Sequence, residues 1–208
     1  MKYPRTFHHP ESPGVSSDDK VIKTLDAFIG QQVVITEKMD GENTTCTNSG
    51  CHARSLDSVN HPSRNWVKNF HGSFKHLIPD GWRICGENLY ATHSIHYQDL
   101  ESYFYGFSVW DDRFNVALDW DSTLLWFEDL GITPVKELYR GEYTEAVITN
   151  LIKNFDTNLH EGFVCRVIGE IPYEDFNKLV FKWVRPNHVQ TETHWMHSEM
   201  KVNKLKGI

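Results

Sequence analysis

Most of the chain alternates hydrophobic and polar residues in short runs that are typical of β-strands. Residues 31–37 are rich in β-branched side chains. Residues 44–47 turn at Asn48-Ser49-Gly50 into residues 51–54, which is the pattern of a β-hairpin. Further runs with the β-branched and aromatic content of strands are residues 82–89, 103–110, 160–168 and 178–184.

Other stretches have helical spacing instead. In residues 65–78 aromatic and aliphatic side chains recur one helical turn apart, before a turn at Pro79-Asp80-Gly81. Residues 121–130 begin with an acidic residue and stop at Gly131, and residues 143–155 give a second helix of this kind. Because strands and helices do not alternate as regular βαβ units, the sequence predicts an α+β fold with mostly antiparallel sheets and flanking helices.

Length and composition place the chain among globular proteins of ordinary size. Its 208 residues, 39% of them hydrophobic and 24% charged, suffice for one domain with a full core or at most two small ones. No run approaches the roughly 20 apolar residues that cross a bilayer, and the first residues contain no apolar segment of a signal peptide. We therefore expect no membrane contact and a cytoplasmic location.

The cysteines Cys46, Cys51, Cys85 and Cys165 form no C-x-x-C pair. Cys46 and Cys51 flank the predicted hairpin turn, so they are expected to face each other. Reduced thiols are the favoured interpretation, with a disulfide or a metal pair as the alternatives.

The net charge of −7 limits how such a chain binds nucleic acid. Neutralising phosphates needs local Lys and Arg side chains, which an acidic total does not exclude. Residues 3–10 mix basic and aromatic side chains and either contact RNA or pack as an extended arm. Lys201, Lys204 and Lys206 either follow a nucleic-acid backbone or form the solvated face of a closing helix. The total charge predicts modest, salt-sensitive affinity.

An ordered set of short motifs carries the chemistry. Each motif alone is a weak signal, because strings this short arise by chance. The order of the motifs, and the position of each at a strand or strand end, make the set specific. The motifs are residues 37–43 (EKMDGEN), 53–55 (ARS), 86–88 (GEN), 107–109 (FSV), 161–164 (EGFV) and 181–183 (FKW).

This set resembles the signature of the covalent nucleotidyltransferase superfamily, which contains ATP-dependent DNA ligases, RNA ligases and mRNA capping enzymes. It is most similar to phage-type, nick-sealing RNA ligases, whose lysine motif also has an asparagine at the position of Asn43. The resemblance covers roughly residues 30–190. It implies a ligase adenylation fold in a single domain over residues 1–208. Residues 1–30 would then be an N-terminal arm and residues 186–208 a C-terminal helical tail, too short for an OB domain.

The sequence departs from the family pattern at two positions. Ser108 stands where the family usually has an aspartate, and Val184 stands where it usually has a second lysine. Arg185 is our candidate for the missing cation.

The resemblance implies that Lys38 attacks the α-phosphate of ATP and carries AMP covalently. The attacking amine must be neutral, and a lysine loses its proton readily beside other cations, whereas arginine does not. Lys182 would hold the α-phosphate and favour the neutral form of Lys38 through like-charge proximity. The alternative for each lysine is a solvated side chain at a strand end.

The resemblance also assigns two carboxylates. Glu87 would bind the ribose hydroxyls, and Glu161 would help to hold a divalent ion, Mg²⁺ or Mn²⁺. Magnesium sites at nucleotides use few carboxylates together with phosphate oxygens and water, so sparse acidic residues fit. Solvated surface acids are the alternative.

Other residues of the motifs would contact the nucleotide. By the period-two rule Tyr105, Phe107 and Val109 share one strand face. By resemblance Phe107 stacks on the adenine, with a core position as the alternative. Glu37 would contact the adenine amino group. The remaining assignments are Arg54, for a phosphate or the 3′-terminal sugar, and Asn43, for the AMP phosphate or the 5′ end.

The function that follows is ATP-dependent joining of RNA 3′-hydroxyl and 5′-phosphate ends, in a host cytoplasm if the protein is phage-encoded. The substrate is RNA ends, either in a nicked duplex or single-stranded. The alternatives are a minimal DNA ligase, an inactive nucleotide- or RNA-binding module of the same fold, and a guanylyltransferase.

Overall fold

The computed structural model describes residues 2–55, 61–186 and 200–207. By its contacts the chain divides into two compact units, each assembled from separate segments. The first unit contains Met1–Tyr3, Asp40–Pro134 and Val189–Ile208, and the second contains Pro4–Met39 and Val135–His188. The single-domain organisation stays a prediction. Within the described residues, no helix is both long and apolar enough to span a bilayer.

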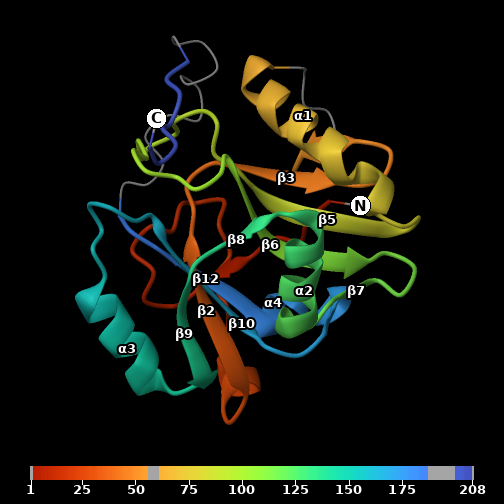
Figure 1. Ribbon diagram of the computed structural model, residues 1–208. Coiled ribbons are helices and arrows are strands. Elements are labelled where there is room, and N and C mark those ends of the chain that lie inside the picture. The colour runs from red at the N-terminus through yellow and green to blue at the C-terminus, as the bar shows by residue number, and fades with distance from the viewer. Residues whose placement is uncertain (1, 56–60, 187–199, 208) are drawn as a thin grey trace. The chain divides into compact units, whose positions relative to one another are not determined.

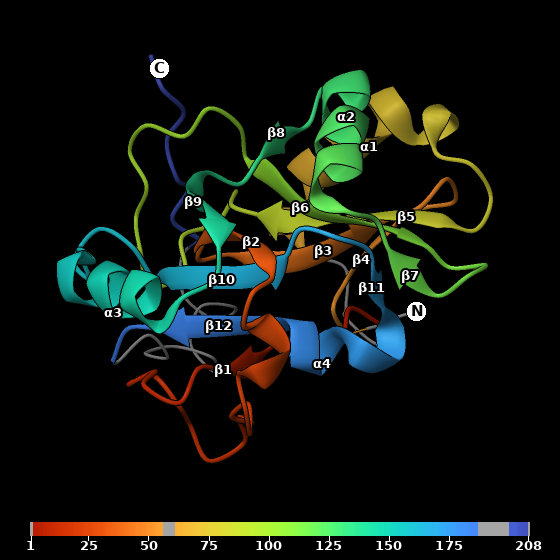
Figure 2. The same ribbon diagram turned by 90° about the horizontal axis from the view of Figure 1, so that it is seen from below.

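The second unit is built on a sheet with the strand order β1-β12-β10-β2-β9. Figure 2 shows β10, β12 and β1 side by side. The short β1 is parallel to β12, and the other neighbours are antiparallel. The strands are β1 (Phe7–His8), β2 (Gln32–Lys38), β9 (Glu137–Glu142), β10 (Gly162–Val167) and β12 (Val180–Val184).

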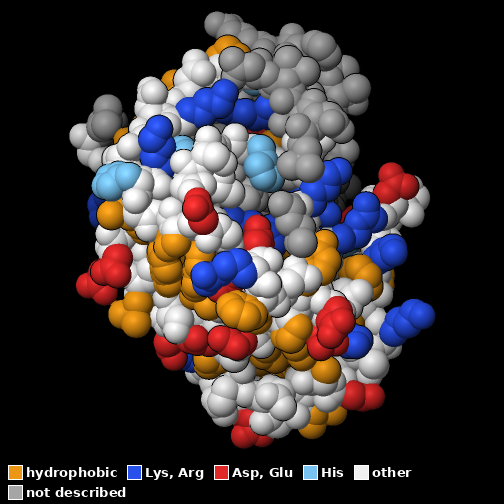
Figure 3. Space-filling view, turned by 90° about the vertical axis from the view of Figure 1, so that its right-hand side faces the viewer, with side chains coloured by type: hydrophobic (Ala, Val, Ile, Leu, Met, Phe, Trp, Pro, Cys, Tyr) orange, Lys and Arg blue, Asp and Glu red, His pale blue; other side chains and the backbone are white. Residues whose placement is uncertain are grey.

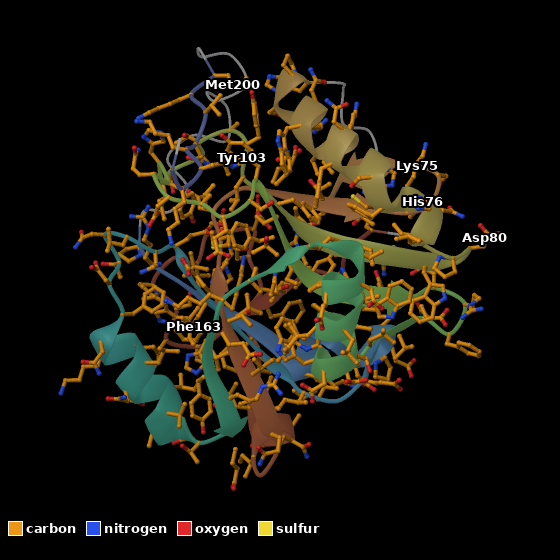
Figure 4. The ribbon with its side chains drawn as sticks, viewed as in Figure 1. Lys75, His76, Asp80, Tyr103, Phe163 and Met200 are labelled. Carbon is orange, nitrogen blue, oxygen red and sulfur yellow. The ribbon has the colours of Figure 1, made fainter. Side chains whose placement is uncertain are left out.

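One face of this sheet is packed with aromatic side chains. Phe163 and Trp183 stack with their ring centroids 5.5 Å apart, and Phe28 packs on Phe181 at 5.1 Å. Phe163, labelled in Figure 4, also packs on Phe155 at the end of α3. The remaining elements of the unit are α3 (Glu145–Asn154), α4 (Phe176–Leu179), η1 (Asp26–Phe28), η4 (Tyr173–Asp175) and β11 (Ile171–Pro172).

The first unit is built on a sheet that runs in the order β7-β6-β5-β3-β4, with β8 parallel to β6. Helices α1 and α2 both contribute to the hydrophobic core on one face of this sheet (Figure 1). The strands are β3 (Glu42–Cys46), β4 (Cys51–Ala53), β5 (Trp82–Asn88), β6 (Phe104–Asp111), β7 (Val116–Ala117) and β8 (Thr133–Pro134). The helices are η2 (Pro62–Arg64), α1 (Asn65–Phe74), η3 (Lys75–Leu77) and α2 (Trp120–Leu130).

Local sequence signals explain where the longer helices begin and end. The Asp119 side chain accepts a hydrogen bond from the Ser122 backbone at the start of α2, and Thr144 does the same for α3. Gly131 ends α2 with a φ of 64°, a conformation that glycine adopts without strain. The predicted helices are therefore confirmed to within a few residues.

The predicted strands and the α+β fold class are confirmed as well. Cys46 and Cys51 face each other across the hairpin, as expected, and both are free thiols. The sequence did not indicate β9, because its half-exposed residues ELYRGE lack a hydrophobic face.

The expected C-terminal helix is wrong for residues 200–207, and residues 187–199 of the predicted tail lie outside the described residues. Residues 200–207 lie along residues 89–103 instead. The buried Asn203 side chain donates to the backbone of Leu89 and accepts from Thr92. Tyr103, labelled with Met200 in Figure 4, donates to the Asn203 carbonyl. The bonds of Asn203 thus fix this segment in an extended, non-helical conformation.

Candidate active site

Beside Lys38, at the end of β2, the strands β10 and β12 approach each other very closely. In the sheet register Lys38 lies opposite Gly162, and Gly162 lies opposite Val184. A Cβ atom at Gly162 would lie 2.0 Å from the Trp183 carbonyl oxygen, so only glycine fits there. The close packing of the strands therefore explains why the residue opposite the proposed nucleophile is a glycine.

Lys38 and Lys182 share one face of this sheet. Thr36 lies opposite Val164, and Val164 lies opposite Lys182. Because side chains alternate along a strand, Lys38 lies on the same face as Thr36 and therefore as Lys182. The Lys38 ammonium donates a hydrogen bond to the Glu161 carboxylate, which is almost fully buried. The expected cluster of Lys38, Lys182 and Glu161 is therefore present on one surface.

The surroundings of Lys182 are those of a charge partly removed from water. Burial lowers the pKa of Lys182, the neighbouring Lys38 lowers it further, and Asp19 and Glu161 oppose the shift. The Lys182 Nζ lies 3.6 Å from the Asp19 carboxylate. A partly buried ammonium is a strong fixed charge for a phosphate, since water screens it little.

Glu37 points to the opposite face from Lys38, because the two are adjacent in one strand. Its carboxylate hydrogen-bonds with His160 Nδ1 at 2.6 Å, and its backbone N–H donates to Lys136. Glu37 is thus bonded to His160, and Lys38 is bonded to Glu161. The contact of Glu37 with an adenine amino group stays a prediction.

The Asp40-Gly41 half of the lysine motif belongs to the first unit and is fixed there. The Asp40 carboxylate accepts hydrogen bonds from the Ser94 backbone, the Ser94 hydroxyl and the Ile95 backbone, each at 2.7 Å. A Cβ atom at Gly41 would lie 2.5 Å from the Asn88 carbonyl oxygen. Asp40 and Gly41 therefore anchor the chain that follows the nucleophile.

Asn43 and Glu87 lie in one row across the sheet of the first unit. Asn43 of β3 is opposite Glu87 of β5, and Glu87 is opposite Tyr105 of β6. This row is on the face away from the core formed by Phe104 and its neighbours. The Asn43 side-chain oxygen is buried and has no hydrogen-bond partner among the described residues. An acceptor left in this state suits a ligand that donates to it.

A β-bulge corrects the predicted face of Val109. The register between β5 and β6 shifts so that Cys85 pairs with Ser108 and Gly86 with Gly106, which leaves Phe107 as the extra residue. The prediction that Phe107 and Val109 share a face is therefore wrong. Val109 is in the core, whereas Phe107 is half-buried.

Tyr3 packs its ring edge against Phe107, with the ring centroids 5.1 Å apart. Tyr3 also contacts Trp110, at 6.2 Å. The first residues of the arm thus support the aromatic ring that we assign to the adenine.

The two arginines of the predicted site lie at strand ends. Arg54 is exposed just after β4, and its backbone N–H donates to the Asn43 carbonyl at 3.0 Å. Arg185 follows β12, and its backbone N–H donates to the Glu161 carbonyl at 2.9 Å. Arg54 is thus tied to Asn43, and Arg185 to Glu161.

The site residues therefore form two groups on two sheets. Lys38, Glu161, Lys182 and Arg185 belong to the second unit, together with Glu37. Asn43, Arg54, Glu87 and Phe107 belong to the first. The lysine motif is the continuous segment that belongs to both.

A family model described as RNA ligase matches residues 31–184. The chain belongs to the RNA ligase family. The match contains all the motifs named above and confirms the family that they predicted. No curated protein matches this RNA ligase family member significantly in sequence.

Solved structures confirm the fold of this family member. An archaeal ATP-dependent RNA ligase has a TM-score of 0.61 and 16% identity, covering 88% of this chain and 48% of that chain. The RNA ligase of Naegleria gruberi has a TM-score of 0.55 and 19% identity, covering 88% of this chain and 57% of that chain. A candidate ATP-dependent DNA ligase of Aquifex aeolicus has a TM-score of 0.56 and 17% identity, covering 88% and 50%. The chain thus spans about half the length of these proteins.

The sequence motifs do not include several residues that contact the site residues: Tyr3 and His8, in the arm of residues 3–10, and Asp19 and His160. His160 directly precedes Glu161, and its position opposite Glu37 follows only once the register of β10 on β2 is known. Asp19 stands three residues after Ser16, a spacing that signals a local turn but gives no indication of Lys182.

Proposed function

We propose that this protein is an ATP-dependent RNA ligase that carries AMP on Lys38. The observation that carries the proposal is the arrangement on the sheet of the second unit. There, Lys38 is hydrogen-bonded to Glu161 and lies on the same face as the partly buried Lys182. A potential nucleophile beside a fixed cation and a buried carboxylate is the arrangement that phosphoryl transfer requires.

The first step is the attack of Lys38 on ATP. An amine in an ion pair with Glu161 is protonated and cannot attack, so the pair has to part and the ammonium has to lose its proton. The neutral Nζ then forms a bond to the α-phosphorus while the bond to the bridging oxygen of pyrophosphate breaks. Lys182 offsets the negative charge that builds up on the α-phosphate.

Two further transfers complete the reaction. A 5′-phosphate oxygen attacks the phosphorus of the lysyl-AMP, which frees Lys38 and leaves AMP on the RNA end. The 3′-hydroxyl then attacks the 5′-phosphorus, a phosphodiester forms, and AMP leaves. In the first unit, Asn43, through the N–H groups of its side-chain amide, and Arg54 are the residues we assign to the RNA and AMP phosphates, and Glu87 to the ribose.

A divalent ion fits the residues that are present. Among the described residues no group of three or more His, Cys, Asp or Glu side chains could hold a metal alone. Glu161 is a single carboxylate, and Mg²⁺ at nucleotides needs few of these beside phosphate oxygens and water. Structures of the Naegleria gruberi enzyme with ATP or AMP and Mn support this assignment. Bound with ATP, the ion would neutralise phosphate charge and help pyrophosphate to leave.

The acidic total charge does not oppose an RNA substrate. Basic and acidic side chains both reach the surface on the face seen in Figure 3. Lys201, Lys204 and Lys206 are exposed on the segment fixed by Asn203. Their contact with an RNA backbone stays a prediction.

Phe107→Ala should weaken ATP binding by roughly 1–3 kcal/mol, the contribution of a stacked base, and ATP should bind better than GTP. The measurement is nucleotide affinity per folded molecule, by calorimetry. Phe114→Ala is the matched control, because Phe114 is 77% exposed at the β6–β7 turn. Unchanged affinity together with a lower melting temperature would show that Phe107 has only a packing role.

Sealing should require ribose at the 3′-hydroxyl side of a nick. A 2′-hydroxyl both donates and accepts hydrogen bonds, so a site can test for it directly. The assay compares four nicked duplexes that differ only in ribose or deoxyribose on either side of the nick. Equal rates on all four would favour the DNA ligase alternative, and faster sealing of a 3′-deoxyribose end would refute RNA specificity.

A further inference from the structure

The loop after β1 brings a carboxylate to Lys182 from a distant part of the chain. Asp19 Oδ1 lies 3.6 Å from the Lys182 Nζ. Both side chains are mostly buried, with 22% and 18% of their surfaces exposed. Ion pairs between exposed side chains contribute little, whereas removing one partner of a pair largely shielded from water leaves the other charge uncompensated.

The Asp19 carboxylate is itself fixed by further contacts. Its other oxygen, Oδ2, accepts from the Ser16 hydroxyl at 2.8 Å and from the Ser16 backbone N–H at 3.1 Å. The same oxygen lies 3.3 Å from His8 Nε2. Burial raises the pKa of Asp19, but the Ser16 bonds, assisted by Lys182 and His8, bring it to about 2. Asp19 is therefore a carboxylate with one oxygen held and the other turned to Lys182.

The fold of the arm explains why Asp19 reaches this place. His8 of β1 is the register partner of Lys182 in β12. The His8 backbone N–H donates a hydrogen bond to the Lys20 carbonyl, and the His8 carbonyl accepts one from the Ile22 N–H. The loop that follows β1 therefore returns to β1. His8 is fully buried, and its Nδ1 hydrogen-bonds with Ser12 at 2.8 Å. The loop is therefore anchored at His8, directly beside Lys182.

We propose that Asp19 is a positioning residue that holds the Lys182 ammonium on the catalytic face. The arm would then be part of the nucleotide site rather than a packing element. Asp19 and His8 precede the segment that the family model matches, residues 31–184, so the assignment does not come from the family motifs. It rests on the proposed function, because it presumes that Lys182 binds the α-phosphate.

The chemistry explains why this help is needed. Two lysines share one face, and the reaction needs one of them neutral and the other charged. Two ammonium groups in one partly buried site repel each other. Lys38 is paired with Glu161, and that pair has to part before the attack, whereas Asp19 takes no part in the reaction and can stay with Lys182. Losing the Asp19 carboxylate would remove the charge that anchors the Lys182 side chain beside Lys38.

The test measures binding of α,β-methylene-ATP, whose α,β-link cannot be cleaved in the first step, by calorimetry with Mg²⁺. Asp19→Asn should weaken binding roughly tenfold, because the amide keeps the shape of the carboxylate but removes the charge that pairs with Lys182. Asp19→Glu should restore part of the affinity. In a Lys182→Ala background Asp19→Asn should have no further effect, because residues that act through one another are not additive.

Asp175→Asn is the matched control, because Asp175 pairs with Lys178 in an exposed ion pair of the same unit; it should leave binding unchanged. Equal weakening by Asp19→Asn with and without Lys182 would overturn the proposal, as would wild-type affinity of a folded Asp19→Asn protein. Failure of the wild-type protein to bind the analogue would refute the proposed function itself.

Discussion

Lys38→Arg is expected to abolish covalent AMP transfer while the protein stays folded. Arginine can keep the ion pair with Glu161, but it does not lose its proton and so cannot attack phosphorus. Loss of a nucleophile typically costs about ten-thousand-fold or more in rate, which puts the label below detection. The measurement is transfer of α-labelled AMP to the denatured protein, together with a melting curve.

Two further variants make this result specific. Lys38→Ala should lose the same activity but also stability, because it leaves the buried Glu161 carboxylate without its lysine. Lys136→Ala should be labelled like the wild type, since Lys136 is exposed and contacts β2 through its carbonyl oxygen. Labelling of the Lys38→Arg protein at another residue would contradict the assignment of the nucleophile.

Lys182→Ala should slow covalent AMP transfer about 100- to 1,000-fold, the usual cost of removing a group that stabilises the charge of a transition state. Lys182 is the partly buried ammonium on the face of Lys38. Water that fills the space left by the side chain would not restore its positive charge. The rate of the first step, measured under single-turnover conditions with saturating ATP, is the quantity to compare.

Lys178→Ala is the control for Lys182→Ala. Lys178 belongs to α4, directly before β12, but its side chain is 66% exposed and pairs with Asp175. This variant should react like the wild type. A Lys182→Ala rate within a few-fold of the wild type, in a folded protein, would exclude Lys182 from the first step.

The sequence predicted the parts of the fold that depend on local patterns. The β-branched run at residues 31–37 and the hairpin turn at Asn48-Ser49-Gly50 set β2, β3 and β4. Motif order and family resemblance placed Lys38, Glu161 and Lys182 in one site, and the structure brings these three together.

Features that depend on strand register or on contacts between distant residues could not be predicted from the sequence. A bulge of one residue at Phe107 reverses the alternation that placed Val109 beside it. The pairing of Glu37 with His160 requires the register of β10 on β2. Asp19 meets Lys182 only because a parallel pairing of β1 with β12 brings residues far apart in the chain together. Two-residue strands such as β1 have too little pattern to be recognised.

If Lys38 carries AMP, the mass of the wild-type protein should show it directly. The protein is incubated with ATP and Mg²⁺, denatured, weighed intact and then digested. We expect a mass increase of one AMP, located on Lys38 in the peptide that contains residues 37–43, and reversed by pyrophosphate. No adduct in a folded protein, or an adduct on any other residue, would contradict it.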